Sequence, residues 1–121
     1  MTTVLVVDDE PLLAMALKAA LEDEGYDVLT GANGKQALEQ MAQTRADVVL
    51  LDMMMPVMSG PAMLKAMAAS PSLRDIPIII LSSLPEAIVR AQADPAAILQ
   101  KPCTVAEVLS AIVKVLSGEG S

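Results

Sequence analysis

Residues 4–11 read VLVVDDEP, an apolar run that ends abruptly in three acidic residues and a proline. The run Val4–Val7 is apolar at every position, which is typical of a strand buried on both faces of a parallel sheet. Pro11 is a favourable residue for the first turn of a helix. One face of that helix would carry only apolar residues, namely Leu13, Ala16, Leu17, Ala20 and Leu21. The segment therefore predicts a buried strand, an acidic turn and an amphipathic helix.

The same alternation of strand and helix patterns continues along the chain. Further strands are predicted over Tyr26–Thr30, Asp47–Leu51, Ile76–Leu81 and Ala97–Gln100. Helices are predicted to follow the caps Asn33, Ser59 and Thr104, with a short helix over residues 86–93. Glu107, three residues after Thr104, completes a capping box. Five βα units with short connections predict an α/β fold, a doubly wound parallel sheet with helices on both faces.

Composition excludes several classes of function. The chain has 121 residues, with no Phe and no Trp. It also has no His, so a His-containing triad or a His-ligated metal site is impossible. A single Cys excludes an internal disulfide. The formal charge of −7 disfavours direct binding to nucleic acid. No apolar run approaches the roughly 18 residues of a membrane span, and no basic leader precedes Lys18, so we expect a cytoplasmic protein without membrane contact.

Polar side chains stand where the predicted strands end. These residues are Asp8 and Asp9, Asp52, Ser82 and Lys101. Because a doubly wound sheet binds ligands beyond the carboxyl ends of its strands, we expect them to converge on one rim. Three close carboxylates repel one another and need a cation, and hard oxygen ligands suit Mg²⁺. A carboxylate can also be a covalent nucleophile, so a metal, a lysine and a hydroxyl around one Asp predict phosphoryl transfer.

The sequence resembles the receiver domain of two-component response regulators, including stand-alone receivers of the chemotaxis type. The resemblance rests on VLVVDDE at 4–10, LLDMMMPVMSG at 50–60, LSS at 81–83 and KP at 101–102. It covers residues 1–121 as one receiver domain, with residues 117–121 expected to be a frayed tail. The resemblance implies a flavodoxin-like receiver fold with strand order 2-1-3-4-5.

The resemblance also implies roles for the acidic residues. Asp52 would be the phosphoacceptor and a metal ligand. Asp8 and Asp9 would complete the acidic site, with the backbone carbonyl of Met54 as a further ligand of Mg²⁺ or Mn²⁺.

The remaining site residues would act on the phosphoryl group. Lys101 and Ser82 would bind it, and Ser82 would move towards it after transfer. The Lys101–Pro102 bond is expected to be cis, which an X–Pro bond permits. One position departs from the family, because Ile98 stands where many receivers carry a switch aromatic. The usual signal relay is therefore altered while the phosphorylation site is intact.

The implied function is Mg²⁺-dependent transfer of phosphate to Asp52 from a histidine kinase or a histidine phosphotransfer protein. The domain would act on no separate substrate, so we expect it not to be an enzyme in the ordinary sense. Phosphorylation would shift it between two states that differ in binding an unidentified downstream protein. The face formed by the fourth helix, fifth strand and fifth helix could form a dimer.

Two other functions fit parts of the pattern. Ile98 and a short fourth helix also suit an interaction module that no longer uses phosphate. A phosphatase of the haloacid dehalogenase type uses an Asp nucleophile on a similar sheet. That class needs a second Asp two residues after the nucleophile, where this chain has Met54, and 121 residues leave no room for a cap domain.

Some conspicuous residues have simpler interpretations. Met53–Met55 resembles a soft-metal cluster, but methionines fill cores far more often. Cys103 is expected to be a partly buried small hydrophobe, since no His is present to activate it. Asp47 is expected to begin a strand, and Glu10 to be a solvated neighbour of the site.

Overall fold

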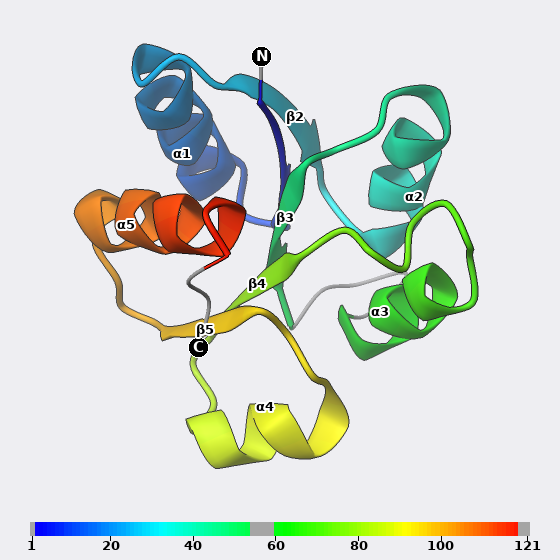
Figure 1. Ribbon diagram of the computed structural model, residues 1–121. Helices are drawn as coiled ribbons and strands as arrows, with labels where there is room; N and C mark the ends of the chain where they lie inside the picture. Colours follow the sequence, from blue (N-terminus) through cyan, green and yellow to red (C-terminus); the bar gives the residue numbers. More distant parts are fainter. Residues whose placement is uncertain (1, 54–59, 119–121) are drawn as a thin grey trace.

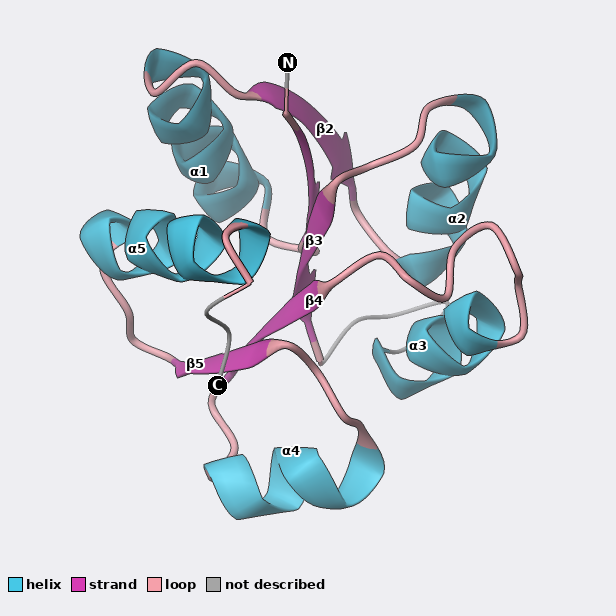
Figure 2. Cartoon of the chain, viewed as in Figure 1, coloured by secondary structure: helices cyan, strands magenta, loops and turns pink. Residues whose placement is uncertain are grey.

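A computed structural model describes residues 2–53 and 60–118, and Figures 1 and 2 show the arrangement of its elements. Five parallel strands form one sheet in the order β2-β1-β3-β4-β5. The strands are β1 (Thr3–Val7), β2 (Asp27–Gly31), β3 (Val48–Asp52), β4 (Ile78–Ser82) and β5 (Ala97–Gln100). The predicted fold class and strand order are confirmed.

Helices cover both faces of this sheet, as Figure 2 shows. They are α1 (Pro11–Asp23), α2 (Gly34–Gln43), α3 (Gly60–Ala68), α4 (Glu86–Gln92) and α5 (Val105–Leu116). Helices α1 and α5 pack on one face, while α2, α3 and α4 lie on the other. Within the described ranges, every helix is too short or too polar to cross a bilayer.

Two aliphatic cores, one on each face of the sheet, replace the missing aromatic residues. Strands β1, β3 and β4 are buried along nearly their whole length and contribute side chains to both cores. The core under α2, α3 and α4 includes Met41, Met53, Met63 and Met67. Met53 is therefore a core residue, as predicted, because unbranched thioethers fill irregular space between aliphatic side chains. Met54 and Met55 lie outside the described residues.

The predicted helix signals are confirmed where the structure describes them. The Asn33 side chain accepts the Gln36 N–H at the start of α2. Thr104 and Glu107 form the capping box of α5. Gly25 has a φ of 92° just after α1, a conformation that only glycine adopts readily. The predicted cap Ser59 lies outside the described residues, as do residues 119–121 of the predicted tail.

Three strands begin later than the sequence pattern predicted, and the first of them, β2, begins at Asp27 rather than at Tyr26. The Asp47 carboxylate accepts the Thr3 N–H at 2.8 Å and its own N–H donates to the Thr3 carbonyl, so Asp47 contacts the start of β1 while β3 begins one residue later. Ile76 is buried, but its N–H donates to the Leu73 carbonyl rather than to a neighbouring strand. The apolar pattern included Ile76 in the strand because this residue is buried. The strand β4 itself, as its hydrogen bonds define it, begins at Ile78.

Helix α4 is the least anchored helix. It has seven residues, of which Val89 alone has a buried side chain among those described. Val89 enters the same core as the partly buried Ile98 and Leu84. The predicted short fourth helix is thus present, with Val89 as its one buried side chain among those the structure describes.

Candidate functional site

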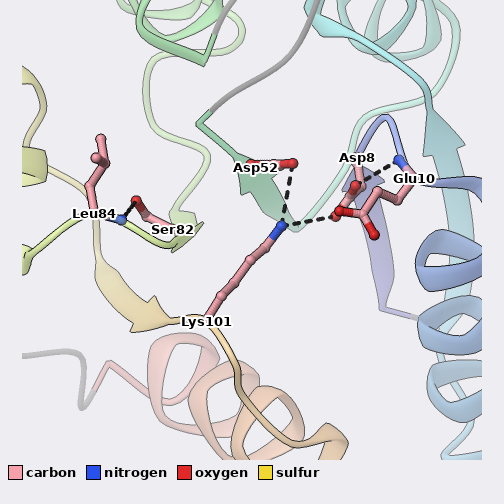
Figure 3. A network of polar contacts seen from close by, with 6 residues as sticks. All are labelled: Asp8, Glu10, Asp52, Ser82, Leu84 and Lys101. Carbon is pink, nitrogen blue, oxygen red and sulfur yellow. Dashed lines mark hydrogen bonds and ion pairs between the residues drawn. The ribbon is translucent and has the colours of Figure 1, made fainter.

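The polar residues at the strand ends meet at one edge of the sheet, as Figure 3 shows. Asp8 follows β1, Asp52 is the last residue of β3 and Ser82 is the last residue of β4. Lys101 follows β5. Parallel pairing places these carboxyl ends side by side, with β1 next to β3, β3 next to β4 and β4 next to β5. The predicted rim is therefore assembled by sheet topology.

Three carboxylates form the centre of this rim. One carboxylate oxygen from each of Asp8, Asp9 and Asp52 lies within 4.8 Å of the other two. Asp8 and Asp52 are buried, and Asp9 is exposed to solvent. The predicted metal ligands that the structure describes are thus brought together. The fourth, the carbonyl of Met54, lies outside the described residues.

Asp8 is the most constrained of the three. Its backbone N–H donates to the Gly31 carbonyl at 3.0 Å, and its Oδ1 accepts the Glu10 N–H at 2.9 Å. Its Oδ2 is buried and has no hydrogen-bond partner in the described part of the chain. Burial is the main cause that raises the pKa of Asp8, and Asp52 and Glu10 add to it. The Glu10 N–H and Lys101 act against that rise.

Lys101 supplies the positive charge of the site. Its Nζ lies 3.4 Å from Asp52 Oδ2 and 3.8 Å from Asp8 Oδ2. Burial lowers the pKa of Lys101, but the combined effect of Asp52 and Asp8 raises it by more than burial lowers it, so the net shift is upward. The ammonium group is therefore held in its charged form between two buried carboxylates. The bond from Lys101 to Pro102 is cis, as expected.

Ser82 is buried beside this centre and is held by the loop that follows it. Its Oγ accepts the Leu84 N–H at 2.9 Å, and Figure 3 shows the hydroxyl directed towards that amide. The side chain of Gln100, at the end of β5, donates to the Leu84 carbonyl at 2.9 Å. Sequence reasoning missed Gln100. Its position two residues after Ile98, on the same face of one strand, was the available signal.

The two remaining residues of interest sit in the two cores. Ile98 is partly buried against the core under α2, α3 and α4. Cys103 is partly buried against the core under α1 and α5, as predicted. Burial, then the Glu107 carboxylate, raises the pKa of the Cys103 thiol, while Lys101 opposes the rise. The thiol is thus kept protonated, which does not suit a nucleophile.

The donor set fits a hard divalent cation. Three carboxylates supply oxygen ligands only, and one of them has a buried oxygen with no hydrogen bond in the described structure. Mg²⁺ prefers a few carboxylates and keeps water and phosphate oxygens as its other ligands. The single lysine offsets only part of the negative charge, so a cation would relieve the remaining repulsion.

Comparison with known proteins agrees with this geometry. The sequence profile of the response regulator receiver domain matches residues 4–113. The transcriptional regulatory protein PrrA of Mycobacterium tuberculosis is 31% identical over 121 residues, covering 98% of this chain and 51% of PrrA. The probable transcriptional regulatory protein TcrX of the same organism is 43% identical over 82 residues, covering 67% of this chain and 34% of TcrX. The matched segments span about half of PrrA and about a third of TcrX.

Solved structures show the same fold. The chemotaxis protein CheY4 of Vibrio cholerae superposes with a TM-score of 0.90 at 30% identity, covering 95% of this chain and 98% of CheY4. The receiver domain of a histidine kinase from Syntrophus aciditrophicus has a TM-score of 0.87 at 34% identity, covering 98% and 92% of the two chains. The receiver domain of the sensor histidine kinase PA1611 from Pseudomonas aeruginosa has a TM-score of 0.84 at 30% identity, covering 97% and 98%. That structure has a magnesium ion coordinated in its active-site cleft.

Proposed function

Because the chain belongs to the response regulator receiver domain family, we propose that it accepts a phosphoryl group on Asp52 in a two-component phosphorelay. The observation that carries the proposal is the position of Lys101. Its Nζ lies within 3.8 Å of carboxylate oxygens on both Asp52 and Asp8. A cation held beside a buried carboxylate is well placed to stabilise the charge of a phosphoryl group on that carboxylate.

The proposed transfer step is a displacement at phosphorus by Asp52. A carboxylate oxygen of Asp52 attacks the phosphorus of a phosphohistidine, forming a P–O bond as the P–N bond breaks. The imidazole of the donor leaves with the electron pair of that bond and takes up a proton. Lys101 and the Ser82 hydroxyl then donate to the phosphoryl oxygens.

A divalent cation belongs to this proposal. Asp8, Asp9 and Asp52 would hold Mg²⁺ or Mn²⁺, with the Met54 carbonyl as a proposed further ligand. When bound, the ion supplies charge neutralisation for the transferring phosphoryl oxygens. The work of the chain's own residues is to orient Asp52 and to hold Lys101 beside it.

The proposed partners follow from the chemistry of the site. A histidine kinase or histidine phosphotransfer protein supplies the phosphoryl group, because the chain has no His of its own. The domain catalyses only its own phosphorylation and dephosphorylation, and it passes the signal on by a shift between two states. The downstream protein, a dimer through the face of α4, β5 and α5, and a cytoplasmic location stay predictions.

A second candidate function rests on Ile98. A β-branched aliphatic residue has few rotamers and no hydroxyl, so it cannot act as the usual aromatic switch. An interaction module on the same fold, independent of phosphate, would need neither that switch nor Mg²⁺.

One experiment separates these two functions. The protein is incubated with acetyl phosphate and Mg²⁺, and phosphorylation is followed by intact mass. We expect wild type to gain one phosphoryl group and Asp52→Asn to gain none. Asp23→Asn, which changes an exposed Asp at the end of α1, should behave as wild type. An unmodified wild type would leave the phosphate-independent module as the better explanation, whereas equal labelling of Asp52→Asn would show that Asp52 is not the phosphoacceptor.

A further inference from the structure

Two side chains hold a single loop residue, Leu84, from opposite ends of its backbone. Its N–H donates to Ser82 Oγ at 2.9 Å, a contact drawn in Figure 3. Its carbonyl accepts the Gln100 side-chain amide, also at 2.9 Å. Leu84 therefore links the hydroxyl beside the phosphoacceptor to the edge strand β5.

The sheet explains why Gln100 can make this contact. Gln100 is the register partner of Ser82 in the β4–β5 pair, so the two residues lie side by side. It also follows Ile98 by two positions, and alternate residues of a strand share a face. Ile98 and Leu84 pack against the same core, the one under α2, α3 and α4. Gln100 thus lies on the strand face where the usual aromatic switch would act.

Any movement of Ser82 towards a phosphoryl group must involve this link. A serine hydroxyl has one donor hydrogen and two acceptor sites, so Ser82 can accept from Leu84 while donating to a phosphoryl oxygen. The displaced hydroxyl would then draw the Leu84 amide with it. Gln100 holds the other end of Leu84 and so opposes that displacement.

The movement has a direct route to α4. Pro85, the residue after Leu84, caps α4, and its carbonyl accepts the N–H groups of Ile88 and Val89. Because Val89 is the only described residue of α4 with a buried side chain, little packing resists a shift of the helix. A displacement of Leu84 would therefore shift α4 and alter the surface that this helix presents.

We propose that Gln100 is a positioning residue for the phosphorylation switch. Its side-chain amide holds the loop between β4 and α4 in the geometry of this structure. The hydrogen bond from Gln100 to the Leu84 carbonyl breaks when Ser82 moves to the phosphoryl group. This inference rests on the proposed phosphoacceptor function. It gives a chain without a switch aromatic a different, polar connection between Asp52 and α4.

The test uses beryllofluoride with Mg²⁺ as a stand-in for the phosphoryl group, titrated into ¹⁵N-labelled protein. Gln100→Met keeps the length of the side chain and removes its donor, while Gln100→Lys keeps a donor. Gln43→Met changes an exposed glutamine at the end of α2 and is the matched control. The readouts are the apparent affinity for beryllofluoride and the amide signals of Leu84 and α4.

We expect Gln100→Met to bind beryllofluoride about two- to tenfold more tightly than wild type, since one neutral hydrogen bond no longer favours the unbound geometry. Its unbound Leu84 and α4 signals should lie part-way towards their bound positions. Gln100→Lys should return both readouts to wild-type values, and Gln43→Met should leave them there.

Two results carry opposite meanings for the two proposals. If wild type responds to beryllofluoride but Gln100→Met binds it with unchanged or weaker affinity, the role of Gln100 is wrong and the phosphoacceptor function stands. If wild type itself shows no Mg²⁺-dependent response, the phosphoacceptor function fails, and the role of Gln100 fails with it.

Discussion

Asp8 shows how function and stability conflict at a single residue. Its side chain is 1% exposed, yet it is a carboxylate that lies close to the carboxylate of Asp52. Lys101 lies 3.8 Å away, beyond hydrogen-bond distance, and Asp8 Oδ2 has no hydrogen bond in the described structure. A buried carboxylate with incomplete partners destabilises a fold. We attribute its presence to cation binding rather than to stability.

Replacing this carboxylate should therefore stabilise the metal-free protein. In EDTA, Asp8→Asn should raise the free energy of unfolding by about 1 kcal/mol, because a neutral amide is less costly to bury and can still accept the Glu10 N–H. Excess Mg²⁺ should stabilise wild type but not the variant, since only the intact site binds the ion in the folded state. Urea unfolding with and without Mg²⁺ measures both effects.

The control for this prediction is the exposed Asp23→Asn, which should change stability little and keep the response to Mg²⁺. A metal-free Asp8→Asn that is less stable than wild type would contradict our view of Asp8. It would show that the ion pair with Lys101 outweighs the burial of the charge.

At the residue scale, sequence predicted the charged part of the site but not its polar connection. Sequence predicted Asp8, Asp52 and Lys101 because each stands where a predicted strand ends, and parallel strands end at one edge. Gln100 also stands at the end of a strand, β5, but a glutamine on an edge strand does not by itself indicate a functional site. Its role depends on a contact with a backbone carbonyl at Leu84, and backbone positions of loops are not encoded in periodicity.

At the scale of elements, apolar patterns predicted which segments form strands and helices better than where they begin. Ile76 is as buried as a strand residue, yet its N–H bonds locally to Leu73, so burial alone overextends β4. Thr104 and Glu107, in contrast, fixed the start of α5, because a capping box is a local interaction between neighbours in sequence. Boundaries are thus predictable where local side chains set them.

Helix α4 differs from the other helices in what holds it in place. Among the described side chains of α4 only Val89 is buried, whereas α5 buries Val108, Ala111 and Ile112. Its Glu86–Arg90 pair is exposed, and exposed ion pairs of this spacing add little stability. We therefore expect α4 to open locally, far more often than the whole domain unfolds.

Hydrogen exchange tests this expectation. The backbone amides of Val89 and Ala93 should exchange at least about 100-fold faster than those of Val108 and Ile112, since local opening needs much less free energy than global unfolding. Exchange is followed by two-dimensional NMR in D₂O without Mg²⁺. Equal protection of α4 and α5 would mean that the single anchor at Val89 is enough, and the mobility that we assign to α4 would be wrong.

At the scale of the whole molecule, exposed apolar side chains are unevenly distributed. Among the described residues, the large exposed ones lie only on α1, α4 and α5: Leu12, Met15, Ile88, Val105, Val113 and Leu116. Leu12 and Met15 are 83% and 65% exposed, and α1 begins three residues after Asp8. A cavity of about 440 Å³ lies between α1 and α5, lined by Leu13, Leu17, Val105 and Val108 and edged by Glu10 and Lys101.

Given the proposed function, a phosphohistidine donor must cover the rim to reach Asp52. The apolar start of α1 lies next to that rim in a chain of net charge −7, so we expect the donor protein to bury Leu12 and Met15. The double variant Leu12→Gln, Met15→Gln should slow transfer from an autophosphorylated histidine kinase about tenfold, because buried apolar anchors dominate interface energies. Its phosphorylation by acetyl phosphate should equal that of wild type, since the small donor needs no docking surface.

Val113→Gln is the matched control, because Val113 is 57% exposed on α5 but lies near the end of the helix remote from the rim. The histidine kinase used is the member of a panel that transfers phosphate to wild type fastest. The rate of transfer from this kinase and the rate of labelling by acetyl phosphate are both measured from the label on Asp52. If transfer from the kinase is unchanged in the double variant, the donor docks elsewhere on the molecule. If labelling by acetyl phosphate falls equally, α1 supports the geometry of the site rather than the docking of a partner, because both donors use the same Asp52, Lys101 and Ser82.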